Sequence, residues 1–150
     1  MHLNLPACQF QIMRSADGDK IFDRLRKKFV ALTPEEWVRQ NFVNYLVEYK
    51  GFPASLMANE VAITLNNTRR RCDTVVYSKM AEPLVIIEYK ASSVEITQQV
   101  FDQIVRYNMV LRAQYLIVSN GLNHYCCSID YDNNSYKFIK DIPNYDALME

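Results

Sequence analysis

The stretch from Arg71 to Lys90 constrains the fold more than any other part of the chain. It reads RCDTVVYSKMAEPLVIIEYK. β-Branched residues predict a strand over residues 71–77, and an apolar run predicts a second strand over residues 84–89, after a turn at residues 78–83. A continuous apolar run bounded by turn residues is typical of a strand that is buried on both faces. The centre of the predicted sheet therefore lies here.

The second of these strands ends in charged residues. Side chains alternate along a strand, so Glu88 and Lys90 point to one side and Tyr89 to the other. If the two strands pair, Asp73 on the first lies near Glu88. Two carboxylates beside an ammonium group suit a divalent metal site with oxygen ligands. The alternative is that Asp73 is an exposed strand-end acid paired with a nearby arginine.

The sequence before this stretch predicts a helix over residues 34–50. Thr33 suits the N-cap and Pro34 the first helical position, and Glu36 completes a capping box. Gly51 and Pro53 end the helix. Apolar residues at helical spacing predict one inward face; they are Val38, Phe42, Tyr45, Leu46 and Tyr49.

The remaining pattern predicts a further strand at residues 56–65, a second helix at 96–112, a strand at 115–119 and a closing hairpin formed by residues 124–129 and 135–139. The inward stripe of the second helix is predicted to hold Ile96, Val100, Ile104, Tyr107 and Leu111. This helix is long enough to be a crossover between parallel strands. The pattern therefore predicts an α/β fold with a mixed central sheet, flanking helices and the order α-β-β-β-α-β plus a C-terminal hairpin.

Residues 1–32 predict an N-terminal arm or hairpin, with short strands at residues 9–12 and 29–32 and a turn at 17–19. A length of 150 residues predicts a single domain, 1–150, with a real core. The last residues, 143–150, are predicted to be loose or a short helix.

Composition limits the classes of function. The formal net charge is zero, which counts against a strong autonomous nucleic-acid binder but leaves room for local basic clusters. One such cluster is Arg69–Arg71, which is either a solvated turn or a nucleic-acid contact through Arg71. Three glycines argue against a glycine-rich phosphate loop, so no nucleotide cofactor is expected. No apolar run suggests a membrane span. The four cysteines form no CxxC pair, and we expect reduced thiols in a cytoplasmic protein.

The spacing of Asp73 and Glu88-x-Lys90 resembles the signature of the PD-(D/E)xK nuclease superfamily. The fuller context, RCDTVVY…EPLVIIEYKAS…ITQQVFDQIVRYN, is similar to the N-terminal nuclease domain of type I restriction enzyme R subunits. This resemblance runs from about residue 33 to residue 125 and implies a restriction-endonuclease-like core. Where the superfamily has proline before the aspartate, this chain has Cys72. The helicase motor of R subunits does not fit in this length, so DNA translocation is not expected.

The resemblance also implies roles for residues. Asp73, Glu88 and the carbonyl of Tyr89 would hold Mg²⁺ or Mn²⁺, and Lys90 would act in catalysis. A glutamate of the first helix would add a metal contact; Glu35 is favoured over Glu36 because it shares the stripe of Val38 and Phe42.

The second helix resembles the Q-x-x-x-Y motif of the RecB-like branch. This likeness implies that Gln103 fixes the site and Tyr107 contacts the nucleic-acid backbone. The alternative is a polar rim residue beside a core tyrosine.

Two functions are compatible with these features. The first is a metal-dependent endonuclease that hydrolyses DNA phosphodiester bonds. The second is a catalytically silent nuclease-fold module for DNA binding or assembly. The partners expected are DNA and either restriction-modification subunits or a second copy of the chain, joined through the closing hairpin.

Overall fold

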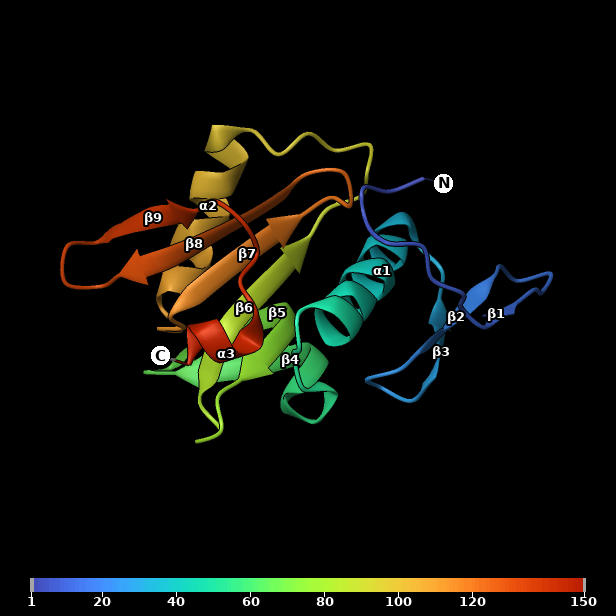
Figure 1. The fold of residues 1–150 in the computed structure, drawn as a ribbon, viewed down its shortest axis with the longest axis horizontal. Helices are drawn as coiled ribbons and strands as arrows, with labels where there is room; N and C mark the ends of the chain where they lie inside the picture. The colour runs from blue at the N-terminus through green and yellow to red at the C-terminus, as the bar shows by residue number, and fades with distance from the viewer. Residues whose placement is uncertain (1, 150) are drawn as a thin grey trace.

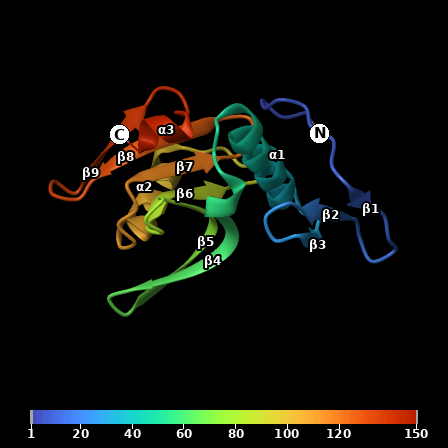
Figure 2. The same ribbon diagram turned by 60° about the horizontal axis from the view of Figure 1, so that its bottom comes forward.

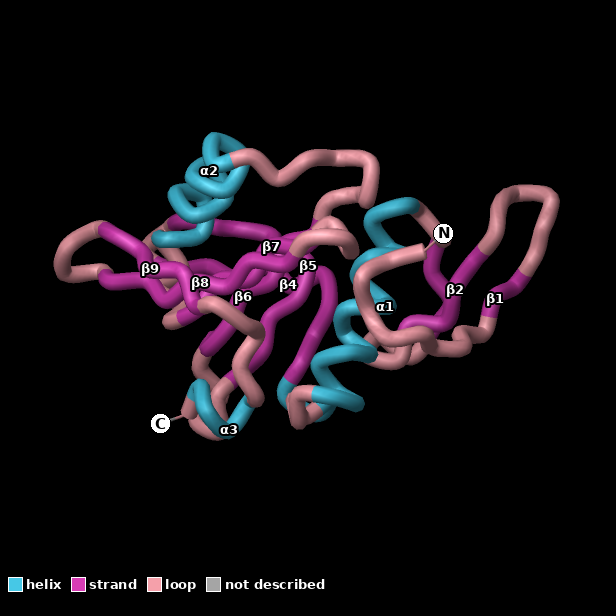
Figure 3. Tube along the Cα trace, turned by 45° about the horizontal axis from the view of Figure 1, so that its top comes forward, coloured by secondary structure: helices cyan, strands magenta, loops and turns pink. Residues whose placement is uncertain are grey.

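A computed structural model describes residues 2–149. Three layers make up the main body (Figure 1): a six-stranded sheet lies between α1 and α3 on one face and α2 on the other. Figure 3 shows α2 and α3 on opposite sides of the strands. The two faces hold separate apolar cores. Because alternate residues of the central strands point to opposite faces, Val85 and Ile87 join one core and Ile86 the other.

The elements follow the predicted order. The helices are α1 (Pro34–Tyr49), α2 (Gln98–Met109) and α3 (Tyr145–Leu148), with a short 3₁₀ turn at Ala54–Leu56. The main sheet holds β4 (Met57–Leu65), β5 (Thr68–Tyr77), β6 (Pro83–Tyr89), β7 (Tyr115–Ser119), β8 (His124–Asp130) and β9 (Ser135–Ile139).

The sheet is mixed, as predicted. Its order is β4-β5-β6-β7-β8-β9; β6 and β7 pair in parallel, and the other neighbouring strands of this sheet pair antiparallel. Helix α2 connects those two strands, as a crossover must. The meander β4–β6 and the hairpin β8–β9 complete the predicted α/β class. The far ends of β4 and β5 extend beyond the rest of the sheet (Figure 2).

The N-terminal arm is a small sheet rather than a hairpin. Strands β1 (Ile12–Met13), β2 (Lys20–Asp23) and β3 (Lys28–Ala31) form an antiparallel three-stranded sheet in the order β1-β2-β3. The sequence analysis missed β2. This strand has four residues, and its buried members are one apolar residue, Ile21, and one acid, Asp23, so the usual alternation is hidden. The small sheet lies beside α1 (Figure 1).

The predicted inward face of α2 is wrong in part, and that of α1 is wrong only at its last tyrosine. In α2 the buried residues are Phe101, Val105 and Asn108, whereas Tyr107 is 46% exposed. In α1, Tyr49 is exposed at the end of the helix. The buried arc of α1 is wider than its apolar stripe, because the main sheet covers one side of the helix and the N-terminal sheet another.

No helix within residues 2–149 combines the length and hydropathy needed to cross a membrane. The four cysteines are free thiols, and Cys126 and Cys127 belong to the two opposite cores. The tail forms the short helix α3.

Candidate active site

Asp73 and Glu88 lie side by side where β5 and β6 part. The last regular pair of these strands is Thr74 with Ile87, so one further step places Asp73 opposite Glu88. Instead of continuing the backbone ladder, the Asp73 carboxylate accepts a hydrogen bond from the backbone N–H of Tyr89 at 2.9 Å. The predicted convergence of the two acids is therefore present.

An open cleft of about 710 Å³ lies over this point. Its lining includes all of the predicted metal and catalytic residues: Asp73, Glu88, Tyr89, Lys90 and Glu35. Helix α2 contributes Gln103 and Tyr107. Arg71 is not part of the lining; it is exposed, with its guanidinium 3.7 Å from Glu60.

The carboxyl group of Glu88 is in an unfavourable place for an isolated charge. Burial, followed by the charge and hydrogen bonding of Asp73, raises the pKa of Glu88 to about 9. Its Oε1 atom is buried and has no hydrogen-bond partner among the described residues. A buried, unpaired acceptor beside a second carboxylate is what a cation would satisfy.

The donor set fits a hard cation in kind but is small. Asp73 and Glu88 offer carboxylate oxygens, which Mg²⁺ and Mn²⁺ prefer. Within residues 2–149, however, no group of three or more His, Cys, Asp or Glu side chains is arranged to hold a metal ion. Mg²⁺ commonly uses one or two protein carboxylates and completes its shell with water and substrate phosphate.

Lys90 lies two residues after Glu88, so both side chains point to the same side of the extended chain. Its backbone N–H donates to the carbonyl of Ser119 at 2.9 Å, which continues the pairing of β6 with β7. Its side chain lines the cleft and makes no ion pair with any residue from 2 to 149. The ammonium group is therefore not engaged by another carboxylate in this part of the chain, and its charge acts on Glu88 from a distance, slightly offsetting the rise in the pKa of that group that burial and Asp73 cause.

The expectation about the first helix needs correction. Glu35, placed on the inward stripe, is exposed, and Glu36 is the buried acid, with 6% exposure. Thr33 caps the helix by accepting from the Glu36 N–H at 3.0 Å. The carboxylate of Glu36 does not return to Thr33, because it binds Arg26, Arg39 and Gln40 instead. Glu35 still lines the cleft, and its contact with a metal stays a prediction.

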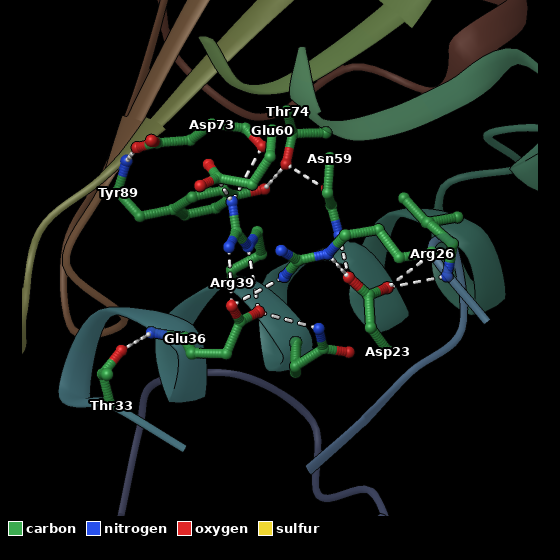
Figure 4. A network of polar contacts seen from close by, with 12 residues as sticks. Asp23, Arg26, Thr33, Glu36, Arg39, Asn59, Glu60, Asp73, Thr74 and Tyr89 are labelled. Atoms are coloured by element: carbon green, nitrogen blue, oxygen red, sulfur yellow. Dashed lines mark hydrogen bonds and ion pairs between the residues drawn. The ribbon is translucent and has the colours of Figure 1, made fainter. Parts of the chain in front are cut away.

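Arg39 is a cleft residue that the sequence analysis missed. Its guanidinium binds both oxygens of Glu36, at 2.6 and 2.9 Å, and also reaches Glu60 at 3.0 Å. The Nη1 atom that binds Glu60 also donates to the backbone carbonyl of Asp73 at 2.9 Å (Figure 4). Burial opposes its charge, but the hydrogen bonds and charge of Glu36, then those of Glu60, raise the pKa of Arg39. A lone arginine inside a helical stripe carried no sequence signal of this role.

The α2 wall of the cleft is more exposed. Gln103 is exposed. The guanidinium carbon of Arg70 lies 4.5 Å from the centre of the Tyr107 ring. The Nε atom of Arg70 also donates a hydrogen bond to the backbone carbonyl of Tyr107 at 3.0 Å. Behind them, Asn108 is 1% exposed, and its side-chain oxygen has no hydrogen-bond partner among the described residues. Arg70, rather than Arg71, is thus the arginine that contacts Tyr107, although neither of the two belongs to the cleft lining.

Comparison with known proteins adds independent information. The family model "Type I restriction enzyme R protein N terminus (HSDR_N)" matches residues 34–143. No match was found among curated proteins. Among solved structures, the chain is similar to a fragment described as an HsdR subunit of a type I restriction enzyme from Vibrio vulnificus YJ016, with a TM-score of 0.56 and 17% identity.

That structural match covers 79% of this chain and 25% of the other, so this chain spans about a quarter of the fragment it resembles. At this identity the likeness shows the fold alone. The family match is more informative, because it spans most of the chain and contains Asp73, Glu88, Tyr89 and Lys90 of the cleft lining. The chain therefore belongs to the family of the type I restriction enzyme R protein N terminus.

Proposed function

We propose that this protein is a metal-dependent endonuclease of the PD-(D/E)xK superfamily that hydrolyses DNA phosphodiester bonds and leaves a 5′-phosphate. One observation carries the proposal. The buried, unpaired oxygen of Glu88 lies beside Asp73 and Lys90 in one open cleft. If Glu88 served only to form an ion pair, its carboxylate oxygens would be expected to have partners. If it had no role, burying an unpaired carboxylate oxygen would cost free energy without compensation.

The residues that would hold Mg²⁺ or Mn²⁺ are Asp73, Glu88 and the backbone carbonyl of Tyr89, with Glu35 as a further contact from α1. When bound, the metal supplies a Lewis acid and lowers the pKa of the attacking water. Asp73 already fixes the backbone beside Glu88 through the Tyr89 N–H, so the two carboxylates are held in place before the cation arrives.

Lys90 acts from the same side of β6 as Glu88. Its ammonium group would orient the attacking water or stabilise negative charge that develops on the phosphate. Because it makes no ion pair within residues 2–149, it loses no existing partner when the phosphate binds.

DNA would lie against the α2 wall. There Gln103 and Tyr107 are exposed, and Tyr107 contacts Arg70, which places a cation next to this wall. The chain as a whole is neutral, so its own affinity for DNA is expected to be low. Other restriction-modification subunits, or a second copy, would add DNA contacts in the cytoplasm.

The test is cleavage of supercoiled plasmid DNA with Mg²⁺ or Mn²⁺, using wild type, Asp73→Ala and Lys90→Ala purified in parallel. Wild type should nick the plasmid, and both variants should lose activity by about 10³-fold or more, the scale of removing a catalytic electrostatic contact. Equal nicking by wild type and Lys90→Ala would reject the proposal.

The same assay addresses the alternative of a catalytically silent nuclease-fold module. If wild type binds Mn²⁺ in a manner that depends on Asp73 but does not nick DNA, then the site is retained without turnover. The role of the protein would in that case be DNA binding or assembly.

A further inference from the structure

A chain of buried polar contacts runs from the N-terminal sheet to the backbone of Asp73. Arg26, which follows β2, binds Asp23 through its Nε and donates from Nη2 to Glu36 at 2.8 Å. Glu36 in turn holds Arg39, and Arg39 donates to the Asp73 carbonyl at 2.9 Å. The acids of this path are almost wholly buried, with Asp23 at 0% and Glu36 at 6% exposure.

A second path leads from Asp23 back to the same place. The Asp23 carboxylate accepts from the side-chain amide of Asn59 at 3.0 Å, and Asn59 accepts from the Thr74 hydroxyl at 2.6 Å. Thr74 accepts from the phenol of Tyr89 at 3.0 Å. The Tyr89 N–H then donates to the carboxylate of Asp73.

Together the two paths close into a circuit, here called the polar ring (Figure 4). Its members are Asp23, Arg26, Glu36, Arg39, Asp73, Tyr89, Thr74 and Asn59. The ring passes through Asp73 and Tyr89, two of the four residues that would contact the metal. It also passes through Asp23 and Arg26, which lie outside the matched family region that begins at residue 34.

We infer that the N-terminal sheet is a positioning element of the metal site, acting through the polar ring. This inference rests on the proposed function. Asp23 and Arg26 are positioning residues: they contact neither Asp73 nor Glu88, and they act through Glu36 and Arg39 on one path and through Asn59 and Thr74 on the other. The polar ring fixes the backbone carbonyl of Asp73, and it fixes both the backbone N–H and the phenol side chain of Tyr89.

The geometry explains why a rigid support is needed there. The regular ladder between β5 and β6 ends at Thr74 and Ile87, so Asp73 and Glu88 lie beyond the last backbone pair. The opposite neighbour of Asp73 on β4 is Glu60, whose φ of 56° takes β4 out of the strand conformation at that point. Metal ligands require placement to within about 0.5 Å. With the backbone ladder interrupted on both sides, the polar ring supplies that precision.

The test uses Mn²⁺ alone, titrated calorimetrically into the full chain. Arg26→Met removes the link between Asp23 and Glu36, and Asp23→Asn removes the charge that holds Arg26. Each should weaken Mn²⁺ affinity by about 10-fold or more, as the loss of outer partners of metal ligands usually does. Arg26→Lys keeps the charge but loses the fork that reaches two acids, so its affinity should be intermediate.

A matched control is Arg24→Met. Arg24 belongs to the same turn and binds Glu48 and Asn44 of α1, each at 3.2 Å, but it is outside the polar ring and the cleft. Its Mn²⁺ affinity should equal that of wild type. All titrations are made well below the measured melting temperature of each variant, so that loss of fold is not counted as loss of metal.

A second measurement needs no metal. Hydrogen exchange of the Tyr89 amide, which donates to Asp73, should accelerate about 10-fold or more in Arg26→Met and remain unchanged in Arg24→Met. If the Arg26 and Asp23 variants are less stable but keep wild-type Mn²⁺ affinity and Tyr89 exchange, then the ring only supports the fold and the inference is overturned. If Asp73→Ala binds Mn²⁺ like wild type, the metal site itself is wrong, whatever the exchange data show.

Discussion

The two walls of the cleft are built in opposite ways. The α1 wall is polar but buried, with Glu36 and Arg39 at 6% and 7% exposure in a closed set of hydrogen bonds. The α2 wall places Gln103 and Tyr107 at the surface, where Tyr107 stacks against Arg70 of the neighbouring strand β5. Buried charges that satisfy one another cannot be replaced singly without cost, whereas exposed ones can.

This difference assigns separate tasks to the two walls. The α1 wall holds the floor of the cleft in one geometry and has few groups left to offer a ligand. The α2 wall has polar and aromatic groups that are free to meet one. Mutations in the α1 wall should therefore act on stability first, and mutations in the α2 wall on DNA binding first.

Arg39→Met should give the largest loss of stability. The change leaves Glu36 and Glu60 without their shared partner and the Asp73 carbonyl without its donor. Removing one member of a buried ion pair typically costs about 3–5 kcal/mol. Urea unfolding of the variant, compared with Arg24→Met, measures this cost. A loss no greater than that of the control would mean that the α1 wall is not the rigid side.

Glu88→Gln should stabilise the metal-free protein at high pH. Burial and the neighbouring Asp73 raise the pKa of Glu88 from 4.5 to about 9, so between these values the folded state keeps a proton that the unfolded chain has released. Stability therefore falls as pH rises through this range.

The glutamine has no proton to lose. Its gain should be on the order of 1–3 kcal/mol near pH 8, the usual cost of an unsatisfied buried group, and should vanish near pH 4. Thermal unfolding in EDTA at the two pH values measures it. A gain that does not depend on pH would show that burial of the Glu88 charge is not the cause.

Tyr107→Ala should change stability by only about 0.5–1 kcal/mol, the worth of an exposed cation–π contact with Arg70. Its effect on DNA affinity should be larger, about tenfold, in a Ca²⁺-containing buffer that does not support cleavage. Fluorescence anisotropy with a labelled duplex measures the affinity. A large loss of stability with unchanged affinity would make Tyr107 a core residue, as the apolar pattern first suggested.

Gln103→Ala should have the smallest effect on folding, within about 0.5 kcal/mol, because its side chain is exposed. Any loss of plasmid nicking by this variant would then come from the site rather than from the fold. The matched comparison is Gln99→Ala, one turn earlier on α2 and outside the cleft lining, which should keep wild-type nicking.

The sequence was most informative about the main sheet. The apolar run ending in Glu88 marked a buried strand, and strand alternation placed Glu88 and Lys90 together. The predicted pairing of β5 with β6 then placed Asp73 near Glu88. These inferences use only periodicity and register, which local sequence determines.

The sequence could not specify what tertiary packing decides. The direction of side chains around a helix drifts by about 20° per seven residues relative to a heptad repeat, so the edges of an apolar stripe are ambiguous. For this reason the prediction assigned the inward position to Glu35 instead of Glu36, and placed Tyr107 on the buried face. The N-terminal sheet covers one side of α1, and nothing local to α1 signals that cover. The polar ring joins residues far apart in the chain, from Asp23 to Tyr89, and no spacing rule connects them. The single-domain boundary at 1–150 stays a prediction.

The central claim is that Asp73 and Glu88 form a cation site at the floor of the cleft. Calorimetric titration of Mn²⁺ into metal-free wild type, Asp73→Ala and Glu88→Ala tests it most directly. The account predicts saturable heat in wild type and none in either variant, with all three proteins folded by circular dichroism. Saturable heat of equal size in wild type and Asp73→Ala, or none in folded wild type, would contradict it.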